Sequence, residues 1–234
     1  FGVYVPQLGD GRALLLGDDF FAVSRQFARE AHRFAPELPL ADLWQALRNV
    51  WIGNSLQMLL ERPLVLGPGL FAYSMLYPLT DNLLDDPALD GRRKCDFGER
   101  FGERLAGRHV RPDDDREAAV FALVRRVEEE FPRAAFPDVH GSLLLIHRGQ
   151  MRSLRQQAGA ALDDDELLAI SCEKGGTSVL ADLFLVAGTP TVEQERFAFG
   201  YGVFLQLLDD LQDVECDLAA GHRTHHQGAE QADP

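Results

Sequence analysis

The sequence predicts an all-α protein whose helices pack as one antiparallel bundle. Apolar residues recur at helical spacing along nearly the whole chain, and no convincing run alternates between apolar and polar residues as strands do. The breaks between the periodic segments are short and rich in proline, glycine and aspartate. Neither internal repeats nor a low-complexity linker interrupts the 234 residues, so we expect one domain over 1–234.

Eight helices are expected along the chain. Their predicted ranges are 18–34, 40–61, 68–86, 92–107, 114–131, 138–159, 164–187 and 191–218. The acids at 113–115 and 163–165 stand where helix N-termini favour negative charge, and Thr191 with Gln194 has capping-box spacing. The segments 40–61, 68–86 and 164–218 are the most apolar, so we expect them at the centre of the bundle.

The charge balance of the chain is strongly acidic. The sequence holds 23 Lys and Arg against 37 Asp and Glu, a formal net charge of -14. Without a basic cluster, such a protein repels nucleic acid and anionic membrane surfaces, so neither is an expected partner. No apolar run reaches the roughly 18 residues of a membrane span, so we expect no membrane insertion. A small polyanion can still bind if divalent cations lie between it and the acids.

The cysteine and histidine patterns point to no site of their own. The three cysteines are far apart and lack metal-finger spacing, which is typical of reduced thiols. No segment resembles a signal peptide, and together these features predict a cytoplasmic location. His222, His225 and His226 lack carboxylate or cysteine partners, so we interpret them as part of a loop rather than as a metal site.

The segment YPLTDNLLDDP at 77–87 brings several carboxylates to the end of an apolar helix. Positions four apart share one face of a helix, so Asp81 and Asp85 point the same way. Tyr73 and Tyr77 precede them on the same ridge. Taken alone, this pattern is also compatible with an ordinary acidic helix end in solvent.

A second acidic helix argues against the explanation that 77–87 is only an acidic helix end in solvent. In FLQLLDDLQDVECD at 204–217, Asp209, Asp213 and Asp217 fall on one ridge with no Lys or Arg between them. Like charges at this spacing destabilise a helix by about a few tenths of a kcal/mol per pair, and Mg²⁺ would offset that cost. If the two ridges face each other, the expected metal ligands are Asp81, Asp85, Asp209, Asp213 and Asp217. The alternative is two unrelated acidic helix ends.

These residues resemble the class I isoprenoid synthases, the all-α superfamily of trans-prenyl diphosphate synthases, squalene and phytoene synthases and terpene cyclases. QLLDDLQDVECDLAAGHR at 206–223 is similar to the prenyl synthase pattern Q-x-x-D-D-x-x-D-V-x-G-D followed by G-K, with Arg223 in place of the lysine. DNLLD at 81–85 resembles the first motif, DDxxD, with Asn82 in the second place. Asp86, which directly follows this motif, is the alternative candidate for a metal ligand.

Further matches and departures refine the resemblance. EKGGTSVLADLFLVAG at 173–188 resembles the family's K-T segment and implies that Lys174 contacts diphosphate. HRGQMRSL at 147–154 resembles G-Q-x-x-D-L, with Ser153 where Asp would be. Nothing before residue 67 matches the G-G-K-R-x-R-P segment that binds isopentenyl diphosphate in chain-elongating enzymes. The helices that normally follow the second motif are also missing, so we expect the chain to be incomplete at its C-terminal end.

The resemblance implies a bundle of the isoprenoid synthase type with a central apolar cavity. It also implies three Mg²⁺ ions, bound together with the diphosphate of a prenyl substrate. The acids expected to act in catalysis are Asp81, Asp85, Asp209 and Asp213. The residues expected to contact substrate are Lys174, Arg223, Arg148, Gln150, Tyr73, Tyr77, Asn54 and Gln206.

The leading functional hypothesis is a Mg²⁺-dependent terpene synthase, a lyase that ionises an allylic prenyl diphosphate and cyclises or deprotonates the cation. The runner-up is a prenyltransferase, which either elongates a prenyl chain or joins two chains head to head as squalene and phytoene synthases do. A non-catalytic bundle is the third possibility, although the intact acid ridges argue against it. Assembly as a homodimer is left open.

Overall fold

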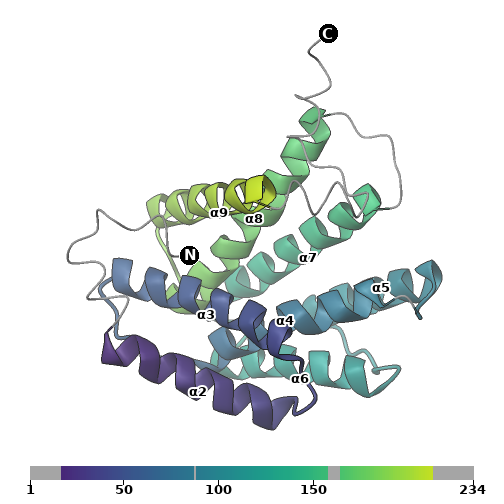
Figure 1. The fold of residues 1–234 in the computed structure, drawn as a ribbon, viewed down its shortest axis with the longest axis horizontal. Coiled ribbons are helices and arrows are strands. Elements are labelled where there is room, and N and C mark those ends of the chain that lie inside the picture. Colours follow the sequence, from purple (N-terminus) through teal and green to yellow (C-terminus); the bar gives the residue numbers. More distant parts are fainter. Residues whose placement is uncertain (1–16, 87, 158–163, 213–234) are drawn as a thin grey trace. The chain divides into compact units, whose positions relative to one another are not determined.

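The computed structural model describes residues 17–86, 88–157 and 164–212, which form eight α-helices and no strand. With the labels of Figure 1, these are α2 (Asp18–Phe34), α3 (Leu40–Leu59), α4 (Pro68–Asp85), α5 (Gly91–Leu105), α6 (Asp115–Glu130), α7 (Pro137–Gln157), α8 (Asp164–Ala187) and α9 (Val192–Gln212). The predicted all-α class is confirmed. The described helix ends lie within about two residues of their expected positions, whereas the expected ends at 159 and 218 fall outside the described residues.

The helices fall into two compact units. The first, Phe1–Asp90 with Pro112–Glu130, holds α2, α3, α4 and α6, and the second, Gly91–Arg111 with Phe131–Pro234, holds α5, α7, α8 and α9. One bundle around a central cavity stays a prediction, because it concerns how these units pack together. Among the described helices, none is long and apolar enough to cross a membrane.

Helix α4 is the core of the first unit, where it packs against α3 and α6. Every residue from 69 to 76 is buried. The helix starts after Gly67 with Pro68 in its first turn, where a missing amide hydrogen costs least. The Glu130 carboxylate, from the end of α6, accepts the amide hydrogen of Gly69. Burial raises the pKa of Glu130, and the hydrogen bond from Gly69 opposes that shift only in part.

An arginine contacts two aromatic rings in the same unit. The Arg126 guanidinium of α6 is 5.0 Å from the ring centre of Phe34 and 4.8 Å from that of Phe71. Phe71 also contacts the ring of Phe27, at 5.6 Å between centroids. These contacts join α2, α4 and α6 through cation–π and ring packing.

Two predicted helix starts are confirmed by their hydrogen bonds. At α9, the Thr191 amide donates to Gln194 Oε1 at 2.8 Å and the Gln194 amide donates to Thr191 Oγ1 at 3.3 Å, which is a capping box. At α6, the Glu117 amide donates to Asp114 Oδ1 at 2.8 Å. The acids at 113–115 therefore serve as a cap, as expected.

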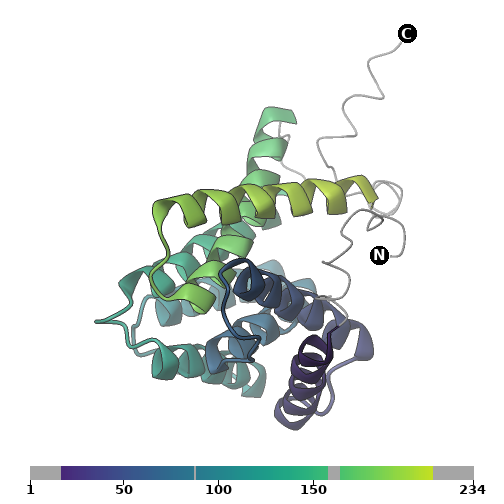
Figure 2. The same cartoon turned by 90° about the vertical axis from the view of Figure 1, so that its left-hand side faces the viewer.

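In the second unit, α8 packs against both α7 and α9, and Figures 1 and 2 both draw α9 crossing α8. Helix α5 packs on α7. There the His147 ring meets the edge of Phe101 at 5.1 Å between centroids, over Gly102. Burial lowers the pKa of His147, which favours the neutral imidazole. His147 thus joins α7 to α5.

Candidate metal and diphosphate site

The first acidic ridge lies at the end of α4, beyond an internal proline. Pro78 lacks the amide hydrogen that would bond to the preceding turn. Thr80 Oγ1 donates to the Leu76 carbonyl oxygen at 2.8 Å, one turn earlier on the same helix. Asp81 is half-buried. Asp85 is the last residue of α4, and its side chain lies outside the described atoms, so the helix does continue through both expected ligands.

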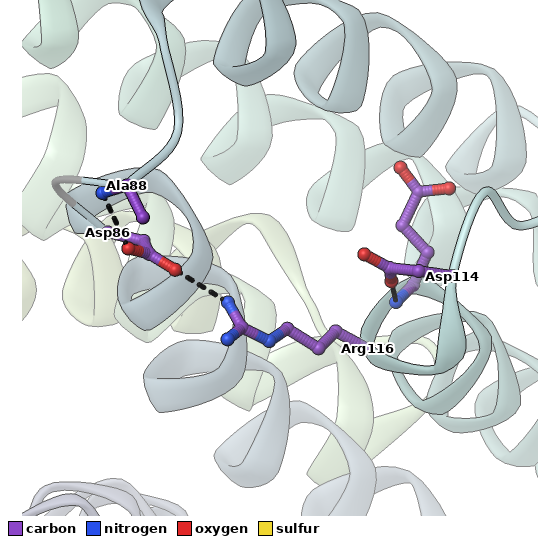
Figure 3. A network of polar contacts seen from close by, with 5 residues as sticks. Asp86, Ala88, Asp114 and Arg116 are labelled. Carbon is purple, nitrogen blue, oxygen red and sulfur yellow. Dashed lines mark hydrogen bonds and ion pairs between the residues drawn. The ribbon is translucent and has the colours of Figure 1, made fainter.

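Asp86, the residue just after α4, has a role in local structure. Its Oδ1 accepts the Ala88 amide hydrogen at 2.8 Å, and its Oδ2 accepts Arg116 Nη1 at 2.7 Å, as Figure 3 shows. This hydrogen bond and the charge of Asp86 raise the pKa of Arg116. Asp86 therefore ties the end of α4 to the first turn of α6, which favours Asp81 and Asp85 over Asp86 as metal ligands.

Asn82, the departure from the DDxxD pattern, contacts a neighbouring helix. Its Nδ2 donates to Oδ2 of Asp42, which lies in the first turn of α3. The carboxylate that Asn82 meets would repel an aspartate at the same place. The Asn82 amide, which can donate a hydrogen bond, therefore suits the Asp42 carboxylate better than an aspartate would.

The second unit contains a very close helix crossing. A Cβ atom built on Gly202 of α9 would lie 2.1 Å from the carbonyl oxygen of Gly175 in α8, and one built on Gly175 would lie 2.4 Å from Gln206 Cβ. On Gly176, it would lie 2.4 Å from the Phe199 ring. Only glycine lets the two backbones approach this closely.

This crossing places the residue after Lys174 against the second acidic helix. Lys174 immediately precedes Gly175, and Gln206 lies directly over Gly175. Gln206 Nε2 donates to Asp210 Oδ1 at 2.8 Å, one turn further along α9. Asp210 is 8 % exposed, whereas Asp209 is half-buried. The structure thus brings Lys174, Gln206 and the first acids of the second motif onto neighbouring helices.

The α7 candidates lie near the same place. A Cβ atom built on Gly149 would be 3.6 Å from Lys174 Cα, so the turn that carries Arg148 and Gln150 approaches α8 at Lys174. Arg148 is exposed and Gln150 is half-buried. Arg152, further along α7, pairs with Glu173 of α8. Three separate segments of the sequence therefore converge around Lys174.

Two of the residues expected to contact substrate, Tyr73 and Asn54 of the first unit, are largely buried. Tyr73 is 5 % exposed, while Tyr77, one turn closer to the acids, is half-buried. Asn54 is fully buried, and its Nδ2 donates to Gln57 Oε1 at 2.8 Å. Gln57 Nε2 in turn donates to the Val65 carbonyl oxygen, and Gln57 Oε1 accepts the Val65 amide hydrogen. This amide network fixes the α3–α4 loop, and contact of Asn54 with substrate stays a prediction.

The rest of the expected site is described only in part. Asp213, Asp217 and Arg223 lie outside the described residues, so the second ridge is represented by Asp209. Asp81 and Asp209 belong to different units, and the facing of the two ridges stays a prediction. Among the described residues there is no group of three or more His, Cys, Asp or Glu side chains that could hold a metal ion.

The donor chemistry of the two ridges nevertheless fits Mg²⁺. The expected ligands are all carboxylates, and the half-buried Asp81 and Asp209 retain contact with solvent. Mg²⁺ prefers a few such oxygens and keeps several water ligands. His147 of α7 packs against Phe101 of α5. The residues therefore suit a hard divalent cation better than a transition metal.

Sequence reasoning missed Asp42 and Arg116, the partners of Asn82 and Asp86. Each lies in the first turn of its helix, where a charged residue is common for other reasons. It also missed the α8–α9 crossing, although the adjacent glycines at 175–176 were a usable signal of close packing.

Comparisons of the chain with models of protein families, with curated proteins and with solved structures found no match.

Proposed function

We propose that this protein is a Mg²⁺-dependent terpene synthase that ionises an allylic prenyl diphosphate and cyclises or deprotonates the resulting cation. The observation that carries the proposal is the α8–α9 crossing at Gly175 and Gly202. It puts Gly175, the residue that follows Lys174, against Gln206, which lies about one turn before the acids of the second ridge. A cation beside an acidic helix end is what a metal-bridged diphosphate requires, since the lysine and the metal ions both bind its oxygens.

The acids of both ridges would hold the metal, namely Asp81, Asp85, Asp209, Asp213 and Asp217. When bound, Mg²⁺ would stabilise the negative charge that develops on the leaving diphosphate. Lys174 would bind a diphosphate oxygen directly and hold the leaving group in one orientation. Arg148 and Arg223 are further candidates for this contact.

The residues preceding each ridge would surround the hydrocarbon part of the substrate. Tyr77 and Tyr73 lie one and two turns before Asp81, and Tyr201 lies before Asp209 and stacks with Phe197 at 6.1 Å between ring centroids. Burial raises the pKa of Tyr201, so its phenol stays protonated. A neutral aromatic face can stabilise a carbocation by up to about 2 kcal/mol when water is excluded.

The test is a product assay with allylic diphosphates of several chain lengths and Mg²⁺, with and without isopentenyl diphosphate. We expect a hydrocarbon or terpene alcohol from the allylic substrate alone. A longer diphosphate formed only with isopentenyl diphosphate would support the prenyltransferase instead. No product from any combination would support a non-catalytic bundle and overturn both enzymatic alternatives.

Substitution of single acids tests the assignment of the ridges. Asp81→Asn and Asp209→Asn should each lower turnover by roughly 10²-fold or more, because each removes a carboxylate that would hold the Mg²⁺ that stabilises the leaving diphosphate. Asp19→Asn and Asp138→Asn remove exposed acids from the first turns of α2 and α7 and serve as controls. Circular dichroism should show that all four variants are folded. Wild-type turnover in Asp81→Asn would remove the first ridge from the site.

A further inference from the structure

Three contacts set the register between α3 and α4. A Cβ atom built on Gly53 would lie 2.5 Å from the Leu70 side chain. The buried Asn49 Nδ2 donates to Ser74 Oγ at 3.1 Å. The contact between Asp42 and Asn82 completes the series. Residue numbers fall along α3 as they rise along α4, so the helices are antiparallel and the beginning of α3 lies against the acidic end of α4.

The last of these contacts lies beyond Pro78. The first two lie on the part of α4 before the proline. Pro78 cannot donate the backbone hydrogen bond to the Ser74 carbonyl four residues earlier, so the final turn is coupled less strongly to the rest of the helix. Contacts from neighbouring helices are then needed to set the direction of the side chains in that turn. Asn82 supplies one such contact, to α3.

We propose that Asp42 and Asn82 form a positioning pair for the metal-binding end of α4. The Asn82 amide, held by the Asp42 carboxylate, fixes the rotation of the turn that carries Asp81 and Asp85, and so directs their carboxylates. This role rests on the proposed function of those two acids. Asp42 lies outside both aspartate-rich motifs and acts through Asn82 rather than on the substrate.

The pair explains why an amide stands at the second place of DNLLD. An aspartate there would put two carboxylates at hydrogen-bond distance without a proton between them. An alternative explanation is that Asn82 is simply a lost metal ligand. The two explanations predict opposite effects of Asn82→Asp: the pair predicts weaker metal binding, and the lost ligand predicts tighter binding.

The experiment uses Asn82→Asp, Asp42→Asn and the double variant that exchanges the two side chains. Mg²⁺ affinity is measured by calorimetry in the presence of inorganic diphosphate. Exchange of the backbone amides at 80–86 is measured without metal. We expect Asn82→Asp to weaken Mg²⁺ binding and to speed amide exchange about fivefold to tenfold, because a charge-assisted hydrogen bond is replaced by repulsion.

The double variant should restore both quantities to within about twofold of wild type, because Asn at 42 can donate to Asp at 82. Asp42→Asn alone should give an intermediate loss. Glu30→Gln serves as a control, because it alters an exposed amide–carboxylate contact, with Gln26 of α2 at 2.9 Å, that does not involve α4. It should change neither measurement.

The outcomes separate the pair from the proposed function. If wild-type protein does not bind Mg²⁺ with diphosphate, the proposed function fails, while the exchange data still report whether the pair orders the end of α4. If Asn82→Asp leaves exchange at 80–86 unchanged, or if it tightens Mg²⁺ binding, the positioning pair is wrong. A double variant no better than the worse single variant would also overturn it.

Discussion

The α8–α9 crossing gives the sharpest test of the fold. In Gly202→Ala, the new methyl carbon would lie 2.1 Å from the Gly175 carbonyl oxygen, and both are backbone-fixed positions that no rotamer change can separate. Relief requires the helices to move apart by roughly 1 Å, which forfeits a quarter to a half of the dispersion energy at the contact. Overpacking of this kind costs about 1–3 kcal/mol, and the better helix propensity of alanine returns up to about 1 kcal/mol.

The matched control lies two residues away on the same helix. A Cβ atom built on Gly200 meets nothing within 4 Å, so Gly200→Ala should stabilise the protein by about 0.5–1 kcal/mol through helix propensity alone. Urea unfolding followed by circular dichroism should therefore place the two variants on opposite sides of wild type. If Gly202→Ala proved as stable as Gly200→Ala, the backbones of α8 and α9 would not be in contact and the placement of Gly175 against Gln206 would be wrong.

Two further predictions concern the first unit. Arg126→Met should lower the free energy of unfolding by about 1–2 kcal/mol, because it removes the charge that contacts the rings of Phe34 and Phe71. The exposed neighbour Arg125→Met should change it by less than about 0.5 kcal/mol, and equal losses in urea titrations would refute the cation–π contact. Glu130→Gln should stabilise the protein at neutral pH: burial raises the folded pKa of Glu130, so wild type loses stability as pH rises above the ordinary value of 4.5. The advantage should vanish below that pH, and a variant less stable than wild type at pH 7 would contradict this sign.

The helices could be predicted because their signals are local. Each helix repeats an apolar pattern over several turns, and caps such as Thr191 with Gln194 involve residues three positions apart. Burial of such a pattern stabilises a helix wherever its partner lies, so the fold class does not depend on knowing the partner.

The contacts that surround the candidate site could not be predicted in this way. Asp42 meets Asn82 across 40 positions of sequence, and Arg116 meets Asp86 across 30. Each contact involves single polar residues, which carry no periodic pattern. The sequence therefore identified the acids at the end of α4 but could not tell which would be used by neighbouring helices.

The same limit applies to the aromatic residues. Phe71 lies on α4 two residues before Tyr73, and the cation that its ring contacts is Arg126 of α6. The spacing of aromatic residues along a helix determines which face of that helix carries each ring. The neighbour across that face depends on tertiary packing, which is why Phe71 and Tyr73 could not be distinguished from the sequence.

The placement of the acids bears on why a cation would bind at all. Negative charge near the C-terminal end of a helix opposes the helix dipole and costs about 0.3–1 kcal/mol per charge. Neither α4 nor the described part of α9 has a basic residue in its last turn. At α4, Arg116 compensates Asp86 from another helix. On the proposed function, Mg²⁺ would compensate Asp81 and Asp85, so metal binding would stabilise the helix end as well as the substrate, and folding and binding would be linked.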